Sequence, residues 1–138
     1  MKSRHKAREL ALQILYQMEM QQESPKEVMN LFWKVGEPVL GEVHDFATAL
    51  VEGVYRNQKE IDQLLETYSA HWRLDRMAVV DRNILRLSGY ELLYSSDMPS
   101  SVVLNEGIEI AKKFGTGDSG SFINGILDRL AKEVRKES

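Results

Sequence analysis

Two amphipathic patterns joined by a glycine-rich segment, between Leu104 and Leu130, constrain the fold of this chain most strongly. Apolar residues recur at helical spacing from Leu104 to Ala111, and a second helical stripe runs from Ile123 to Leu130. This period of about 3.6 residues predicts two helices, each buried along one face. No segment shows the sustained alternation that is typical of a strand. The sequence therefore predicts an all-α fold.

The glycines between the two patterns, Gly115, Gly117 and Gly120, have the GxGxxG spacing of dinucleotide-binding loops. That fingerprint requires a buried strand before the first glycine, whereas a helical pattern precedes Gly115. We expect instead that Gly115 ends one helix in the left-handed conformation, and that Asp118 or Ser119 caps the next helix. A nucleotide-binding enzyme is an alternative, which a strand before Gly115 or binding of ATP or NAD would favour.

The rest of the chain adds five predicted helices, which gives about seven in all. They cover about residues 4–22, 25–35, 43–54, 57–68 and 76–95, and the two helices of the glycine-rich stretch cover about 101–114 and 119–134. Ser24, Pro25 and Glu27 predict a capping box at the start of the second helix. Asp75 is a candidate cap for the fifth helix.

The fifth predicted helix is apolar over a wide arc, so we expect it to be central. Its polar residues Asp81, Arg82 and Arg86 are expected to stay exposed. The segment 69–74, which contains Trp72 and neither glycine nor proline, is the best candidate for a boundary between sub-bundles. We therefore predict a single domain, 1–138, with sub-bundles of roughly 1–70 and 75–138. The tail, residues 132–138, is expected to fray.

The composition excludes several kinds of chemistry. The 138 residues include no cysteine, which rules out disulfides and thiolate sites and suits a reducing cytoplasm. No apolar run approaches the roughly 20 residues that span a membrane. His5, His44 and His71 lie far apart and have no metal-binding spacing. The sequence shows no catalytic constellation, and we predict neither a metal nor a cofactor.

Basic residues crowd the N-terminus although the formal net charge of the chain is -3. Arg4, His5, Lys6 and Arg8 occupy the first turns of the first predicted helix. Cations are unfavourable at a helix N-terminus, so this segment is either a solvated helix end or a phosphate-binding arm. A local basic arm can bind a polyanion even when the whole chain is acidic.

Residues beside the glycines also allow two interpretations. Lys112 and Lys113 close a helix, where positive charge complements the helix dipole. Phe122 offers a face for stacking a nucleic-acid base if it is exposed, worth about 1–3 kcal/mol. If it is buried, Phe122 is a core residue. Periodicity does not decide between these two roles.

Three separated motifs together resemble the NusB family of bacterial transcription antitermination factors. They are RHKARELALQILYQ near the N-terminus, DRNILRLSGYELLY in the fifth predicted helix, and VVLNEGIEIAKKFGTGDSGSFINGILD across the glycines. The resemblance covers essentially the full length and has high specificity, because the motifs occur in the family's order and at its intervals. It implies an all-helical fold of two packed three-helix-like sub-bundles.

The resemblance also implies a function. NusB proteins pair with NusE, a small-subunit ribosomal protein, and the heterodimer binds single-stranded boxA RNA in nascent ribosomal RNA transcripts. With other Nus factors, it keeps RNA polymerase from terminating. The resemblance therefore implies a cytoplasmic RNA-binding adaptor, not an enzyme.

The resemblance assigns site residues position by position. RNA-binding residues are Arg4, His5, Lys6, Arg8, Lys113, Phe114, Asp118 and Phe122. Lysine and histidine at positions 6 and 5 replace arginines that are common in the family, and they lack arginine's planar, bidentate geometry. The NusE side corresponds to Arg76, Asp81 and Arg82. Gly107 replaces a frequent alanine, which either weakens its helix by up to about 1 kcal/mol or allows a close helix contact.

Two further alternatives remain open. Some ribosomal RNA cytosine methyltransferases have a NusB-like N-terminal domain, but the sequence ends at Ser138 without the strand pattern of a catalytic domain. Some NusB proteins form homodimers, and the apolar residues Leu31, Phe32 and Trp33 are compatible with a self-associating helical module.

Overall fold

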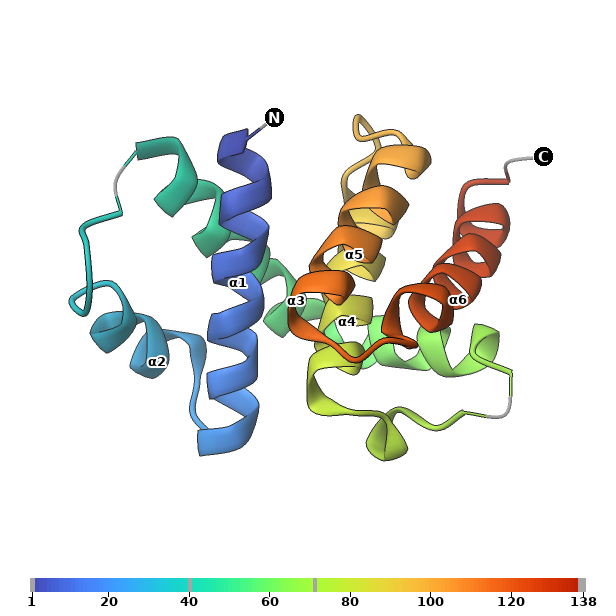
Figure 1. Cartoon of the computed structure of the whole chain (residues 1–138), viewed down its shortest axis with the longest axis horizontal. Helices are drawn as coiled ribbons and strands as arrows, with labels where there is room; N and C mark the ends of the chain where they lie inside the picture. The colour runs from blue at the N-terminus through green and yellow to red at the C-terminus, as the bar shows by residue number, and fades with distance from the viewer. Residues whose placement is uncertain (1, 40, 71, 137–138) are drawn as a thin grey trace. The chain divides into compact units, whose positions relative to one another are not determined.

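The computed structural model describes residues 2–39, 41–70 and 72–136, with Lys2 described by its backbone alone. Its regular elements are helices (Figure 1): α1 (Lys2–Gln21), α2 (Pro25–Phe32), α3 (Gly41–Tyr68), the 3-10 helix η1 (Leu74–Arg76), α4 (Val79–Tyr94), α5 (Ser100–Phe114) and α6 (Ser119–Val134). The described ranges contain no strand. The prediction of an all-α fold is confirmed. His71, one of the three histidines for which the sequence predicts no metal-binding role, lies outside the described residues.

The chain divides into two compact units, which we call unit 1 (Met1–Arg56) and unit 2 (Asn57–Ser138). The division falls within α3, whereas the sub-bundles predicted from the sequence divide at residues 70–75. The third and fourth predicted helices form one continuous helix, α3. Buried Val54, Ile61 and Leu65 keep helical spacing through Asn57, the residue predicted to begin a new helix.

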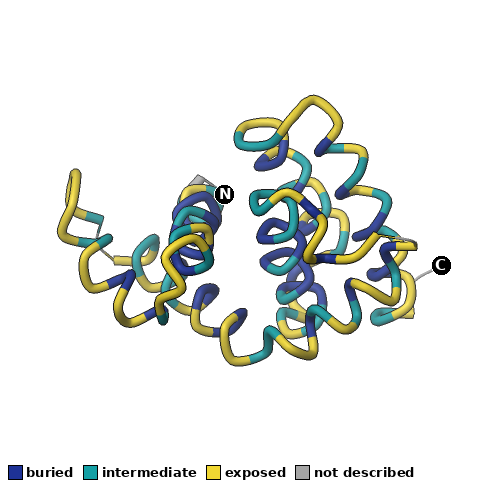
Figure 2. The backbone as a smooth tube through the Cα atoms, turned by 90° about the horizontal axis from the view of Figure 1, so that it is seen from below, coloured by how far each residue is buried: buried dark blue, intermediate teal, exposed yellow. Residues whose placement is uncertain are grey.

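Unit 1 contains α1, α2 and the first half of α3. The predicted apolar stripe of α1 is buried from Ala7 to Met18. Along each helix, buried positions recur between exposed ones (Figure 2). The predicted capping box of α2 is present: the Ser24 backbone N–H donates to Glu27 Oε1 at 2.9 Å, and the Glu27 N–H donates to Ser24 Oγ at 3.3 Å. Hydrogen bonding to the Glu27 carboxylate, first from the Ser24 backbone N–H and then from the Ser24 hydroxyl, holds the pKa of Glu27 below its usual value.

Unit 2 contains the second half of α3, η1, α4, α5 and α6, and the last three helices pack against one another in pairs. The predicted central position of α4 is confirmed, since residues such as Ile84, Leu85 and Leu87 are buried. A Cβ atom at Gly107 of α5 would lie 3.0 Å from Ser88 Oγ and 3.2 Å from Leu127 Cδ1. Glycine therefore permits a close helix contact here, which is the second of the two roles considered for it.

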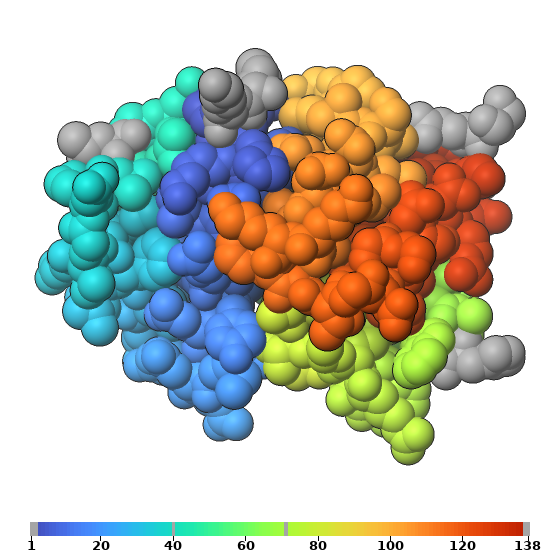
Figure 3. Space-filling view, in the orientation of Figure 1, coloured from blue at the N-terminus to red at the C-terminus, as the bar shows by residue number. Residues whose placement is uncertain are grey.

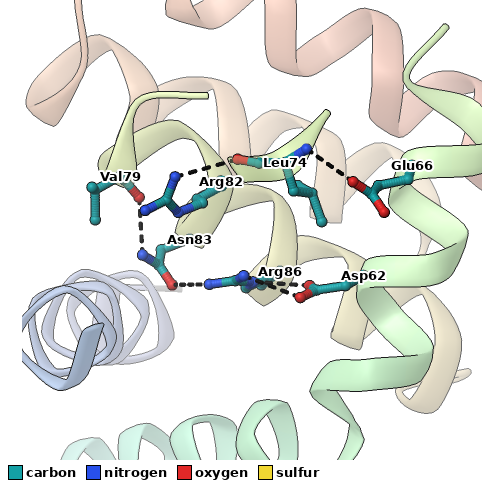
Figure 4. Close-up of polar contacts among 7 residues, drawn as sticks. All are labelled: Asp62, Glu66, Leu74, Val79, Arg82, Asn83 and Arg86. Carbon is teal, nitrogen blue, oxygen red and sulfur yellow. Dashed lines mark hydrogen bonds and ion pairs between the residues drawn. The ribbon is translucent and has the colours of Figure 1, made fainter. Parts of the chain in front are cut away.

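The start of α4 differs from the prediction. Asp75 lies in η1, and α4 begins at Val79 after Ala78, which supplies no side-chain cap. Arg82 folds back instead and donates to the carbonyl oxygen of Leu74 at 3.3 Å (Figure 4) and to that of Met77 at 2.9 Å. Burial, and then the neighbouring charge of Arg86, lower the pKa of Arg82.

The predicted exposure of Asp81, Arg82 and Arg86 is therefore wrong, because all three are half-buried and bonded within unit 2. Arg86 makes a bidentate ion pair with Asp62 of α3, with Nε–Oδ1 at 2.9 Å and Nη2–Oδ2 at 3.0 Å (Figure 4). The pairing joins α4 to the second half of α3. The sequence pattern assigned these residues to the polar face of α4. In the structure, that face contacts another helix.

The tail is more ordered than the sequence predicts, because Arg135 holds it to α4. Its guanidinium donates hydrogen bonds to four backbone carbonyl oxygens and to Ser100 Oγ; the carbonyls are those of Glu91, Leu92, Ser95 and Met98. Three of the carbonyls come from the last turn of α4 and its C-cap, where most carbonyl groups lack partners in their own helix; that of Glu91 also accepts from the Ser95 N–H at 2.9 Å. The predicted fraying is wrong as far as Arg135.

Candidate nucleic-acid interface

The corner between α5 and α6, residues 114–122, lies at the surface of unit 2 (orange to red-orange in Figure 3). A helix, α5, precedes Gly115, so the GxGxxG spacing lacks the strand that a dinucleotide fingerprint needs. Gly115 is extended (φ -97°, ψ -163°), so the predicted left-handed cap is wrong. Glycine is required here for space, because a Cβ atom would lie 2.7 Å from Ser119 Cβ and 2.8 Å from the Ala111 carbonyl oxygen.

Ser119 organises the corner from the start of α6. Its Oγ accepts from the Thr116 backbone N–H at 3.0 Å and donates to Asp81 Oδ1 of α4 at 2.8 Å. Asp118 occupies the predicted N-cap position, but its side chain makes no capping hydrogen bond. The exposed carboxylate of Asp118 is thus not used to cap the helix, and it is available to a ligand.

The aromatic residues of the corner are neither fully buried nor fully exposed. Phe122 is half-buried, and its ring meets Trp72 edge to face at 5.7 Å between centroids. Phe114 is also half-buried, with Lys113 Nζ 5.4 Å from its ring centroid. Trp72 is 56% exposed. Sequence reasoning treated Trp72 as part of a boundary, although an exposed tryptophan in a loop is itself a signal for binding.

The basic residues at the start of α1 are largely engaged inside unit 1. The guanidinium carbons of Arg4 and Arg8 lie 4.8 Å and 5.5 Å from the Phe46 ring centroid. His5 Nε2 lies 3.0 Å from Glu9 Oε2. Arg8 is only 3% exposed, which does not fit a direct phosphate contact, whereas Lys6 is exposed.

The residues predicted to face NusE differ in their availability. Arg76 is exposed, but Asp81 and Arg82 are half-buried and bonded to Ser119 and to the backbone of η1, as described above. Of this set, Arg76 alone is exposed.

The described ranges contain neither a metal site nor a membrane-spanning helix. No group of three or more histidine or acidic side chains there is arranged to hold a metal ion. None of the helices described is both long and apolar enough to cross a membrane.

An all-helical chain with aromatic and charged residues at an exposed corner has the features of a helical nucleic-acid-binding adaptor. Sequence comparison identifies the family, because the sequence pattern of the NusB family matches residues 5–132. This chain belongs to the NusB family.

Relatives and solved structures agree with this assignment. The transcription antitermination protein NusB of Anaeromyxobacter dehalogenans is 50% identical over 128 residues, which are 93% of this chain and 89% of the relative. The protein of the same name from Myxococcus xanthus is 45% identical over 139 residues, 99% of each chain. The structure of NusB from T. maritima superposes with a TM-score of 0.86 at 40% identity, covering 94% of this chain and 91% of that one.

A further similar structure contains the antitermination factors NusB and NusE in complex with dsRNA. Its matching chain has a TM-score of 0.87 at 28% identity, covering 96% of this chain and 98% of that one.

Proposed function

We propose that this chain is an RNA-binding transcription antitermination factor of the cytoplasm that acts with NusE. The pair binds single-stranded boxA RNA in nascent ribosomal RNA transcripts and, with other Nus factors, helps RNA polymerase to avoid termination. The chain is an adaptor and catalyses no reaction. Membership of the NusB family, the names of its relatives and the similar NusB–NusE–dsRNA complex support this proposal.

The RNA-binding part of the proposal rests on the corner of unit 2. Ser119 satisfies the Thr116 N–H and bonds to α4, and the carboxylate of Asp118 makes no capping hydrogen bond to α6. Asp118 accepts hydrogen bonds from a base edge, and Phe122 with Trp72 stacks a base. Aromatic stacking requires unpaired bases, which is why we assign the corner to single-stranded RNA.

The start of α1 supplies attraction to phosphate. Lys6 contacts the RNA backbone directly, together with the exposed parts of Arg4 and His5. Arg8 is buried against Phe46, so we assign it a supporting role in positioning the first turns of α1. Lys113 and Phe114 extend the corner on the α5 side. Arg76 contacts NusE, while Asp81 and Arg82 shape the surface around it.

A titration of labelled boxA RNA tests the proposal, with and without NusE and at two salt concentrations. RNA is expected to bind weakly to the chain alone and more tightly with NusE. Phe122→Ala is expected to weaken binding by about 1–3 kcal/mol, the contribution of one stacked base. Tyr94→Ala is the matched control, since Tyr94 is an exposed aromatic residue about 20 Å along α4 from Asp81.

The proposed function fails if the wild-type chain with NusE does not bind the RNA. The site assignment fails separately if RNA binds and Phe122→Ala has no more effect than Tyr94→Ala. Circular dichroism on each variant shows whether it keeps the helical fold.

Self-association through unit 1 is a second candidate function. A hollow of about 790 Å³ lies between α1 and the α2–α3 connection, and the exposed residues Leu31 (66%) and Val35 (67%) are among those that line it. Exposed apolar groups that share one hollow favour an interface. Sedimentation of the wild type and of Leu31→Glu tests this: a homodimer that dissociates in the variant supports it, and a monomeric wild type contradicts it.

A further inference from the structure

A second hollow lies in the corner of unit 2 and extends over neighbouring residues of α5 and α6. It has a volume of about 430 Å³ and is open to solvent. Its lining combines one cation, two hydroxyls, an amide and small residues: Lys112, Thr116, Ser121, Asn124, Gly115, Gly117 and Gly120, with Ile108 as the large apolar residue. The volume falls within the roughly 300–1,000 Å³ of small-ligand sites. None of the predicted RNA-binding residues lines it.

Two of the three glycines in this lining have no structural reason to be glycine. Gly115 is needed for packing, since a Cβ atom there would collide with Ser119. A Cβ atom at Gly117 would meet nothing within 4 Å, and one at Gly120 would lie at ordinary contact distance, 3.7 Å, from Ile108 Cγ2. Neither of the two has a positive φ. Because Gly120 lies within α6, alanine would suit that helix better than glycine does.

The absence of side chains at Gly117 and Gly120 leaves open space in the hollow. Residues at positions 117 and 120 both border the hollow, so any side chain there would project towards space that is now open. The hollow also adjoins the proposed RNA-binding residues. Ser121, which lines it, follows Asp118 by three positions and precedes Phe122 in the first turns of α6.

We propose that this hollow holds one nucleotide of the RNA, next to the base stacked on Phe122; the inference rests on the proposed function. The amide of Asn124 supplies donors and an acceptor for a base edge, and the hydroxyl oxygens of Ser121, which donates to the Asp118 carbonyl, and of Thr116, which lies 3.3 Å from Ser119 Oγ, supply acceptors. Lys112, whose side chain is 68% exposed and lies 3.8 Å from Glu109, attracts the phosphate. Gly117 and Gly120 keep the space open for the base.

The first test fills the hollow. Gly120→Ala and Gly120→Leu are titrated with boxA RNA in the presence of NusE, and Gly125→Ala serves as the matched control in the same helix, outside the lining. We expect Kd to rise with side-chain size, by about tenfold for leucine, as for the loss of one bound base. The melting temperature of Gly120→Ala should equal or exceed that of the wild type. Gly125→Ala should leave Kd unchanged.

The second test identifies the nucleotide. RNAs with a single abasic position, moved along the boxA sequence, should show one position at which the wild type loses affinity and Gly120→Leu does not. That coupling assigns the base to the hollow.

The third test separates charge from space. Lys112→Gln should reduce the slope of log Kd against log salt by about 0.7, the value for one phosphate contact with single-stranded RNA. Lys132→Gln is the control, because Lys132 is similarly exposed (58%) and also lies near an acidic residue, Asp128, at 3.1 Å. It should leave the slope unchanged.

The outcomes distinguish this inference from the proposed function. If the wild type with NusE binds no RNA, the proposed function fails. If the wild type binds RNA, the hollow is excluded when Gly120→Leu binds equally well and shares the wild-type abasic profile. If Gly120→Leu melts at a lower temperature than the wild type, Gly120→Ala and Lys112→Gln provide the test. Unchanged affinity in Gly120→Ala together with an unchanged salt slope in Lys112→Gln would overturn the inference.

Discussion

Gly115 and Gly117 lie two residues apart, yet the structure requires only the first to be glycine. A Cβ atom at Gly115 would lie within 3 Å of Ser119 and of the Ala111 carbonyl oxygen, while one at Gly117 would meet nothing within 4 Å. We expect Gly115→Ala to lower the free energy of unfolding by about 1–3 kcal/mol, because overpacking forces the corner apart. Gly117→Ala should stay within about 0.5 kcal/mol of the wild type. Urea unfolding measures both, and equal stability of the two variants would contradict this account.

Arg135 is the residue whose loss should matter most for the end of α6. Its guanidinium donates to carbonyl oxygens at distances from 2.6 Å (Met98) to 3.1 Å (Glu91). Hydrogen bonds from a charged donor contribute about 1.5–3 kcal/mol each when removal leaves a partner unsatisfied. Glu91, Leu92 and Met98 are buried, so water does not readily replace the guanidinium at their carbonyl oxygens, and we expect Arg135→Met to lower the free energy of unfolding by about 3 kcal/mol or more in total.

Lys132→Met is the control for Arg135, since it removes an exposed cation from the same end of α6. Such a surface change usually costs less than about 0.5 kcal/mol. If Arg135→Met is no more destabilising than Lys132→Met in chemical denaturation, the hydrogen bonds of Arg135 do not hold the tail.

Among the elements, α2 depends on its capping box. Glu27 has a folded pKa below its ordinary value because the backbone and the hydroxyl of Ser24 hydrogen-bond to its ionised form. The pKa is lowered on folding, so this contribution to stability is complete above the unfolded pKa and disappears as the pH falls through the folded one.

We therefore expect Glu27→Gln to be less stable than the wild type at neutral pH, with a difference that shrinks as acid protonates Glu27. Glutamine retains the neutral hydrogen bond of the capping box but not the charge. Denaturant unfolding at neutral pH and at a pH below the folded pKa of Glu27 measures the difference. A stability difference that is independent of pH would show that the charge of Glu27 contributes nothing.

The sequence predicts elements well where local chemistry decides them. Ser24, Pro25 and Glu27 determine the start of α2, and the apolar stripe of α1 is buried as expected. Prediction fails where distant partners decide. Asn57 resembles a helix start, but α3 continues because burial of Val54 and Ile61 on one face favours an unbroken helix.

The candidate site shows the same limit. Of the two predicted caps, Asp118 lies at the N-cap position of α6 but makes no capping hydrogen bond, and Ser119 bonds to Thr116 and to Asp81, 38 residues away. Trp72 was missed for the same reason, since its contact with Phe122 joins residues 50 positions apart. A pattern of apolar spacing contains no information about such pairs.

In the molecule as a whole, the residues proposed for RNA binding divide between the two units. Unit 1 provides cations at the start of α1, and unit 2 provides the aromatic rings and carboxylate of the corner. With a net charge of -3, the chain as a whole does not attract RNA. Local cations and stacking must therefore account for affinity, and these two contributions respond differently to salt.

This difference predicts distinct effects of two substitutions. Lys6→Gln removes a phosphate contact and should reduce the slope of log Kd against log salt by about 0.7. Phe122→Ala removes stacking, which is not screened by ions, and should shift the whole line to weaker binding without changing its slope.

Lys26→Gln, in an exposed position of α2, is the charge control and should leave the slope unaltered. If Lys26→Gln changes the slope as much as Lys6→Gln does, the overall charge of unit 1 attracts the RNA rather than the start of α1. If Phe122→Ala changes the slope, its ring does not act by stacking alone.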